Sequence, residues 1–295
     1  MARIAGGAAA ENIVRTARFN GWQATLAAED AVGDRLRIAL DDFSSTLPVA
    51  DPVVLARCTN RKLYAGRPLL DSILARLRRI DAGNDIQLHW ITDQDQLRAL
   101  ANLIGRADAL MLTPIEVRRA FLGQVRCDAP PDQLVDEGLS LAALELSGLE
   151  RHMLRLLGVL PATLLKLCGG LRQLADKSRR LVESSSGLCL VSTARQDVLT
   201  DWHVGLAAQR AWLALTEAGC QAQPMMSLPV LDSMAEHGTT APLSEGAAAL
   251  LAEFHSHVPE ASRPAFLMRF GFAEAPSGRT GRLPVERFLA TPGGA

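Results

Sequence analysis

The feature that most constrains this chain is a segment that occurs twice. Residues 7–24 read GAAAENIVRTARFNGWQA, and residues 205–222 read GLAAQRAWLALTEAGCQA. Aligned without gaps, they share six of eighteen positions: Gly7/Gly205, Ala9/Ala207, Ala10/Ala208, Gly21/Gly219, Gln23/Gln221 and Ala24/Ala222. Helices rich in alanine and glycine let two backbones approach closely, so we predict an internal duplication whose two helices pack as a pseudo-dimer core. The alternative is coincidence, because alanine-rich helices resemble one another.

Composition narrows the class of protein. Apolar residues make up 48% of the 295 residues, and 31 Lys+Arg balance 32 Asp+Glu, so we expect a folded chain with no global attraction to nucleic acid or anionic lipid. Local basic clusters are a separate question. The five cysteines are scattered and form no C-x-x-C motif, which is typical of a reducing cytoplasm and not of a metal site. The most apolar stretch, 156–165, is too short to span a bilayer. The sequence therefore predicts a cytoplasmic protein with neither a nucleic-acid nor a membrane partner.

The hydrophobic pattern alternates between helices and a few strands. Helices are expected at 7–21, 69–80, 93–104, from 114 onward, 171–184, 203–218 and 244–256, and strands at 35–40, 86–91, 187–193 and 264–273. The leucine-rich stretch 139–170 is broken by glycines and Pro161 into two short helices or a lid. Such a mixture predicts the α+β class. A dinucleotide domain and a P-loop are excluded because no strand is followed by G-x-G-x-x-G and no Walker A motif is present.

The order of several short motifs resembles the nitroreductase family. They are GAAAENI, RCTNRKLYAGRPL, DEGLSLAALEL, GLCLVST, GLAAQRAWLALTEAGCQAQPMM, FLMRFGFA and GRLPVE. The sequence is most similar to the duplicated branch of the mycobacterial Acg proteins and to the nitroreductase-like part of ThiF-fused proteins. The resemblance implies a central antiparallel or mixed sheet flanked by helices, with the duplicated helices at its core. It also implies FMN in the cleft, hydride transfer from NAD(P)H to an electron-poor small-molecule acceptor, and a homodimer.

The same resemblance divides the chain. Residues 1–48 match part of a first nitroreductase-like half, and residues 49–295 match a second half carrying a leucine-rich insertion at 139–170. The chain is then expected to start inside its first half. The earlier part of that half lies on a longer parent polypeptide, is supplied by a second chain, or is lost.

The best local candidate for a binding site is RCTNR at 57–61. Arg57 and Arg61 are four residues apart, so we expect them to share a helix face and converge on one anion, with Asn60 as a neutral donor. The resemblance implies that they contact the FMN phosphate, as the Arg-x-Ser-x-Arg motif does in the family, although here the middle residue departs from that motif. Without the resemblance, two such arginines are an ordinary solvated helix face.

Two further segments are candidates for contact with the flavin. In GRTGR at 278–282 the glycines expose backbone N–H groups beside Arg279 and Arg282, which is typical of an anion-binding loop. The resemblance matches Arg282 to a C-terminal arginine that contacts the FMN phosphate; a basic tail is the alternative. The resemblance also puts Gln223, Pro224 and Met225, with Met226, near the flavin ring. For the two methionines, ordinary core packing is the simpler explanation.

One expected motif is absent. Members of the family carry Ala-Pro-Ser-x-x-Asn-x-Gln-Pro-Trp, which holds the flavin ring, whereas here Leu70 is followed by SILARLRRIDAGNDIQLHW up to Trp90. This favours two alternatives to catalysis: a pseudoenzyme that sequesters flavin, and an interaction module of a larger fusion. The leucine-rich stretch is compatible with a cleft cover, a membrane contact or a partner contact. The resemblance favours a cover or a subunit contact.

Overall fold

The computed structural model describes most of the chain. The described residues are 1–28, 35–41, 49–83, 85–126, 138–195, 199–239, 244–259 and 262–280. Its helices are α1 (Ala2–Phe19), α2 (Pro52–Ala56), α3 (Asp71–Leu77), α4 (Gln94–Met111), α5 (Ile115–Gly123), α6 (Gly148–Leu157), α7 (Ala162–Leu167), α8 (Gly170–Glu183), α9 (Thr200–Glu217), α10 (Ser227–Glu236) and α11 (Ser244–His255). Its strands are β1 (Gln23–Ala28), β2 (Leu36–Asp41), β3 (Ile86–Ile91), β4 (Val125–Arg126), β5 (Leu139–Ser140), β6 (Gly187–Thr193), β7 (Gln221–Pro224) and β8 (Arg263–Gly271).

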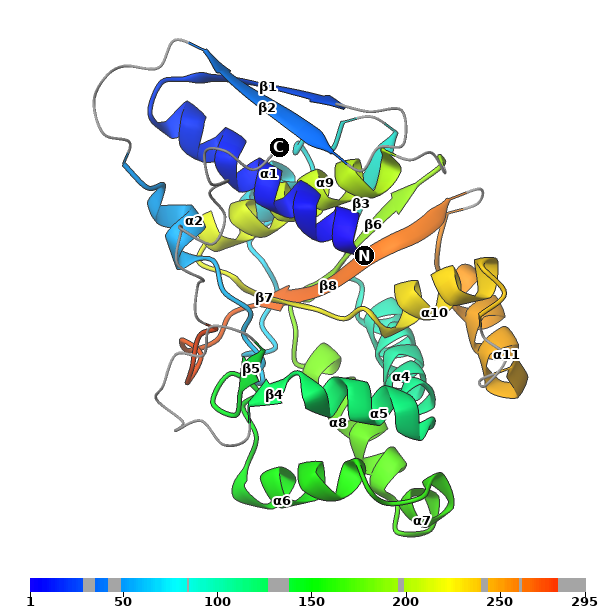
Figure 1. The fold of residues 1–295 in the computed structure, drawn as a ribbon. Coiled ribbons are helices and arrows are strands. Elements are labelled where there is room, and N and C mark those ends of the chain that lie inside the picture. The colour runs from blue at the N-terminus through cyan, green and yellow to red at the C-terminus, as the bar shows by residue number, and fades with distance from the viewer. Residues whose placement is uncertain are drawn as a thin grey trace, which may run out of the picture.

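A four-stranded antiparallel sheet in the order β3-β6-β8-β7 forms the centre (Figure 1). All seven residues of β6 are buried because both faces of the sheet are covered. Leu188 and Leu190 face a core shared with α4, α10 and α11, whereas Cys189 and Val191 face a core shared with α9. This alternation follows from the two-residue period of a strand. The predicted α+β class, with a sheet flanked by helices, is confirmed.

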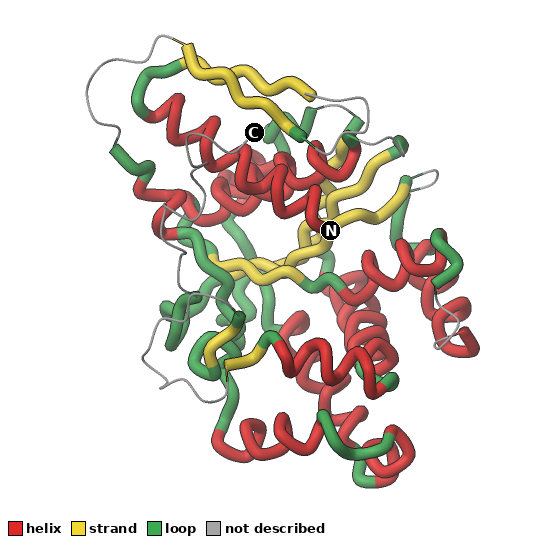
Figure 2. The backbone as a smooth tube through the Cα atoms, viewed as in Figure 1, coloured by secondary structure: helices red, strands yellow, loops and turns green. Residues whose placement is uncertain are grey.

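The two repeated helices cross at their glycines, as the sequence predicts. A Cβ atom on Gly7 would lie 2.1 Å from the carbonyl oxygen of Trp202, and one on Gly205 would lie 2.1 Å from that of Ile4. Only a residue without a side chain permits so close an approach. Figure 2 shows the two helices side by side on one face of the sheet.

The contacts between α1 and α9 are reciprocal. Equivalent positions of the two copies differ by 198, the interval from Gly7 to Gly205. Glu11 pairs with Arg210 at 2.8 Å, and Asn12 accepts a hydrogen bond from Gln209 at 2.7 Å. Residue 11 therefore contacts the equivalent of residue 12, and residue 12 contacts the equivalent of residue 11. Gly7–Trp202 and Gly205–Ile4 are related in the same way. Such exchange of equivalent contacts is the signature of a two-fold axis.

Other elements match the sequence expectations to different degrees. The leucine-rich stretch does contain two short helices, α6 and α7, and Asp93 caps α4 through hydrogen bonds to the backbone N–H groups of Asp95 and Gln96. Several elements were not predicted: β1, which pairs with β2 as a hairpin beside α1, the short strands β4, β5 and β7, and the helices α2 and α10. Long amphipathic helices are easy to detect, whereas short strands depend on partners that are distant in the sequence.

Candidate functional site

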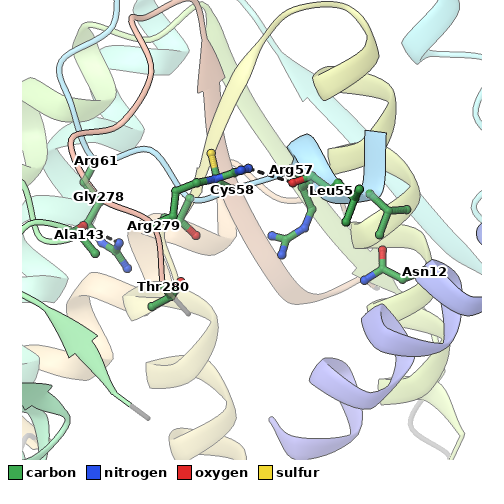
Figure 3. Close-up of a pocket in the computed structure, with 11 residues that line it drawn as sticks. Asn12, Leu55, Arg57, Cys58, Arg61, Ala143, Gly278, Arg279 and Thr280 are labelled. Atoms are coloured by element: carbon green, nitrogen blue, oxygen red, sulfur yellow. Dashed lines mark hydrogen bonds between the residues drawn. The ribbon is translucent and has the colours of Figure 1, made fainter. Parts of the chain in front are cut away.

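A cavity of about 510 Å³ opens beside the helix pair (Figure 3). Its size is in the range of small-molecule sites. It is lined by Asn12, Val54, Leu55, Arg57, Cys58, Thr59, Arg61, Ala143, Gly278, Arg279 and Thr280. Among these described lining residues there are three arginines and no carboxylate. The lining is therefore suited to an anion.

The segment that carries two of these arginines is extended and not helical. Helix α2 has Asp51 as its N-cap and Pro52 at its first position, but it ends at Ala56, and Arg57 has φ −58° and ψ 123°. Thr59 then forms a parallel bridge with Ala222, so the segment continues the sheet beside β7. The expectation that Arg57 and Arg61 share a helix face is wrong, because pairing with Ala222 overrides the local helical pattern. The two residues nevertheless border the same cavity.

Each lining arginine is held in place by the fold. The guanidinium of Arg57 lies 4.5 Å from the ring centroid of Trp212, a buried residue of α9. Arg61 Nη1 donates to the carbonyl oxygen of Ala143 at 2.8 Å. Arg279 Nη2 donates to the carbonyl oxygen of Leu55 at 3.0 Å and to that of Ala56, which are the last carbonyls of α2. These contacts, to carbonyl groups and an aromatic ring, fix the three arginine side chains around the cavity.

Burial makes the positive charge at Arg61 costly. Desolvation lowers the pKa of Arg61, and the negative charge of nearby Glu145 opposes this shift. A charge that is desolvated in this way gains more from an incoming anion than a solvated one does.

Asn12 adds a neutral donor that sequence reasoning missed. Its Oδ1 accepts from Gln209 of α9, which leaves the two N–H groups of the amide as donors on the side of the cavity (Figure 3). The available signal was a polar residue within an otherwise small and apolar helix. The cavity therefore borders both repeated helices: Asn12 of α1 lines it, and so does Arg57, which stacks on Trp212 of α9.

Asn60 is a structural residue, contrary to its expected role as an anion donor. It is fully buried, and its Nδ2 donates to the carbonyl oxygen of Glu274 at 2.8 Å and to Gln221 at 3.3 Å. Its Oδ1 accepts from the backbone N–H of Lys62. The amide is thus committed to the fold, and Asn60 is not among the residues that line the cavity.

The segment expected near a flavin ring also lies elsewhere. Gln223 and Pro224 belong to β7, where Gln223 Oε1 accepts from Arg269 Nε at 2.9 Å. Met225 is buried in the core beneath α4 and α10, so core packing explains it. None of the three lines the cavity. Arg282 and Gly281 lie outside the described residues.

A fully buried arginine on β8 supports the site from beneath. Arg269 donates to the carbonyl oxygens of Leu181 and Lys62, at 2.8 and 2.7 Å, and its guanidinium stacks on Tyr64 at 3.8 Å from the ring centroid. Burial lowers the pKa of Arg269 to about 10. Arg269 donates both to the carbonyl oxygen of Lys62 and to the side chain of Gln223 on β7. It thereby fixes the residues that follow Arg61 against the edge of the sheet.

A second junction orients α2. Asp51 accepts from the backbone N–H of Val53 at 2.7 Å and pairs with Arg15 Nε at 2.7 Å, and Arg15 also pairs with Glu217 at the end of α9. Burial alone would raise the pKa of Asp51, but the hydrogen bonds from Arg15 and Val53 outweigh it and lower the pKa. One arginine of α1 thereby ties α2 and α9 to the helix that contributes Asn12.

Comparison with known proteins adds little to this picture. No family model and no curated protein matches the chain. Among solved structures it is similar to a nitroreductase-like family protein from Bacillus cereus, at 12% identity over 85% of this chain and 100% of that one, with a TM-score of 0.43. It is also similar to the FMN-dependent nitroreductase NfnB from Mycobacterium smegmatis, at 16% identity over 81% and 96%, with a TM-score of 0.41. An NADPH:FMN oxidoreductase from Vibrio harveyi matches at 12% identity over 83% and 77%, with a TM-score of 0.39. Likenesses this distant carry no argument about activity, so the function must be argued from the site.

Proposed function

We propose that the arginine-lined cavity binds the phosphate of FMN and that the chain is a nitroreductase-like flavin oxidoreductase. The observation that supports this most directly is the convergence of Arg57, Arg61 and Arg279 on one cavity without a lining carboxylate. Guanidinium groups suit phosphate because each can donate two parallel hydrogen bonds to its oxygens. The motif order of the sequence, which resembles that of nitroreductases, selects FMN among ligands that carry phosphate.

The described residues fit the phosphate end of this cofactor. The three arginines would supply the charge, and the amide of Asn12 would supply a neutral donor. Gly278 lets its loop lie close to the segment that contains Ala142, because a Cβ on Gly278 would lie 2.7 Å from Ala142 Cβ. When bound, FMN would accept hydride from NAD(P)H and pass it to an electron-poor acceptor; the protein supplies position and charge.

The reciprocal contacts of α1 and α9 support a duplicated origin. On this proposal residues 1–48 represent part of one nitroreductase-like half and residues 49–295 the other, as in the Acg-like and ThiF-fused branch. The homodimer and the cytoplasmic location belong to the same proposal. Four cysteines of the described chain, Cys58, Cys168, Cys189 and Cys220, are free thiols, which is compatible with a reducing compartment.

One observation favours the second candidate, a protein that holds flavin without turnover. Gln223 and Met225, the residues expected near the flavin ring, are engaged by Arg269 and by the hydrophobic core. The stretch that carries the ring motif in the family forms α3 and β3 here. A phosphate site without a ring site would hold the cofactor but not position its reactive edge.

The test has two stages. First, FMN is added to the purified chain, with riboflavin as the control that lacks the phosphate. FMN should raise the melting temperature and riboflavin should do so much less, because ligands that bind only the folded state stabilise it. Equal effects of both ligands, or no effect of FMN, would refute the phosphate assignment. Second, the FMN-loaded protein is mixed with NADH or NADPH without oxygen. Bleaching of the flavin absorbance indicates the oxidoreductase, and its absence indicates the sequestering protein.

A further inference from the structure

The leucine-rich helices α6 and α7 carry an unusual charge pattern. Residues 151–172 contain four cations, Arg151, Arg155, Lys166 and Arg172, and no aspartate or glutamate. The whole chain, in contrast, has a net charge of −1. The near-neutral composition therefore conceals a local basic segment, and this segment is also the most apolar stretch of the sequence.

Large apolar side chains of the same segment are exposed. Leu167 is 83% and Val159 66% exposed, and Leu156 and Leu164 are exposed as well. Figure 1 shows α6 and α7 together at the end of the molecule opposite the β1–β2 hairpin. Scattered exposed apolar side chains need no explanation, but four within twelve residues, at an outer end of the fold, form an apolar patch that water solvates poorly.

The patch cannot cross a bilayer. Helix α6 has 10 residues and α7 has 6, whereas a spanning helix needs about 20. None of the described helices combines the length and the hydropathy that a membrane span requires. Short helices with exposed apolar side chains beside cations instead match a segment that lies in the interface of a membrane.

We propose that α6 and α7, with the turn between them, form a peripheral attachment site for an anionic lipid surface. Val159, Leu164 and Leu167 would enter the boundary between headgroups and acyl chains. Lys166, which is exposed, would face the phosphate and carboxylate groups of the lipid. The cytoplasmic leaflets of cell membranes carry the negative charge that this arrangement complements.

The acidic groups near the patch are occupied within the protein. Glu150, in the first turn of α6, binds Lys177 at 2.6 Å and the backbone N–H of Ser147 at 2.7 Å. Asp176 of α8 lies 3.6 Å from Arg179 and 3.9 Å from Arg172, so Arg172 is the cation whose charge is partly compensated. Lys166 is exposed, and no carboxylate partner is described for it.

Charge also argues against a second copy of the chain as the occupant. A two-fold contact through this patch would bring the basic segments of both copies face to face, and like charges at an interface oppose association. An anionic surface, by contrast, attracts the net positive charge of this segment.

The test is sedimentation of the full chain with vesicles of phosphatidylcholine alone and of phosphatidylcholine with roughly one third phosphatidylserine. The wild type should bind the anionic vesicles, and raising the salt from about 0.1 M to about 1 M should weaken this binding because salt screens surface charge. In V159S/L164S/L167S the affinity should fall at least about tenfold, since each buried methylene contributes roughly 0.8 kcal/mol. In K166E it should fall about thirtyfold, since each cation near the surface contributes about 1 kcal/mol and the reversal changes the charge by two units.

The matched control is L63S/L70S, which removes two leucines that are 62% and 67% exposed but lie outside the patch. It should bind the anionic vesicles like the wild type. The proposal is overturned if the wild type shows no preference for phosphatidylserine, or if the triple variant binds as well as the control. It is also overturned if the wild type does not bind vesicles but self-associates in lipid-free buffer, and the patch variants abolish that self-association. FMN binding is measured without vesicles, so its outcome is independent.

Discussion

The crossing of α1 and α9 makes a sharp prediction about Gly7 and Gly205. In an ordinary helix, replacing glycine by alanine stabilises the helix by roughly 1 kcal/mol. Here the added methyl group would have to move from 2.1 Å to at least 3.4 Å from a carbonyl oxygen of the facing helix, so the two backbones must separate. Overpacking of this kind costs about 1–3 kcal/mol, and the lost approach also weakens the Glu11–Arg210 and Asn12–Gln209 contacts.

We therefore expect Gly7→Ala and Gly205→Ala each to destabilise the protein by about 2 kcal/mol or more, which corresponds to a fall in melting temperature of roughly 3 °C or more for a chain of this size. The assay is thermal unfolding followed by far-ultraviolet circular dichroism. The control is Gly123→Ala at the end of α5, where an added Cβ meets nothing within 4 Å and should leave the melting temperature unchanged or higher. The double variant should cost less than the two single variants added together, because both disturb one contact. Melting temperatures of G7A and G205A equal to that of G123A would refute the close crossing.

Three other predictions follow from the site and its supports. The lowered pKa of Asp51 means that its stabilising contribution is fully present above its ordinary value of 3.8 and is lost as the pH falls through the still lower value in the folded state. Asparagine caps a helix as well as aspartate does but cannot form the ion pair with Arg15, so Asp51→Asn should lower the free energy of unfolding by about 1–2 kcal/mol at neutral pH, with the difference from wild type shrinking in acid. A pH-independent difference in urea titrations would contradict this. Arg269→Met leaves the carbonyl oxygens of Leu181 and Lys62 without their buried donor. It should lower the free energy of unfolding by about 3 kcal/mol in the same titrations and weaken FMN binding. A variant as stable as wild type would contradict the role of Arg269. Cys58 lines the cavity, so bound FMN should slow the alkylation of Cys58 by maleimide. The rate is measured by mass spectrometry in a C127S/C168S background, and an unchanged rate would indicate that FMN binds elsewhere.

The sequence was informative where the cause of a structure is local. Small residues at Gly7 and Gly205 predicted the close helix pair, and the apolar residues of 187–193 predicted the strand β6, which the structure shows to be buried on both faces. It failed at residues 57–61, because the extended conformation there depends on pairing with Ala222, far along the chain. Asn60 and Gln223 looked like binding residues because the sequence does not reveal their partners, Glu274 and Arg269.

The candidate site was predictable in part for the same reason. Arg57 and Arg61 were singled out by residue type and by the resemblance, and Arg279 by the glycines and arginines of its loop; the fold brings the three to one cavity. Asn12 was missed because its role depends on Gln209, which the helix crossing brings beside it. Arg269 was missed because an arginine within an apolar strand reads as a solvent-facing residue until the covering chain at Lys62 is known.

The most direct test of the phosphate assignment is a cycle of two ligands and two proteins, measured by isothermal titration calorimetry. FMN and riboflavin are titrated into the wild type and into R57A/R279A. The cavity described above predicts that the wild type binds FMN at least about a hundredfold more tightly than riboflavin, since hydrogen bonds to charged groups contribute about 1.5–3 kcal/mol each. In R57A/R279A most of that preference should disappear while riboflavin binding stays the same. A preference for FMN that survives the loss of both arginines would contradict the assignment.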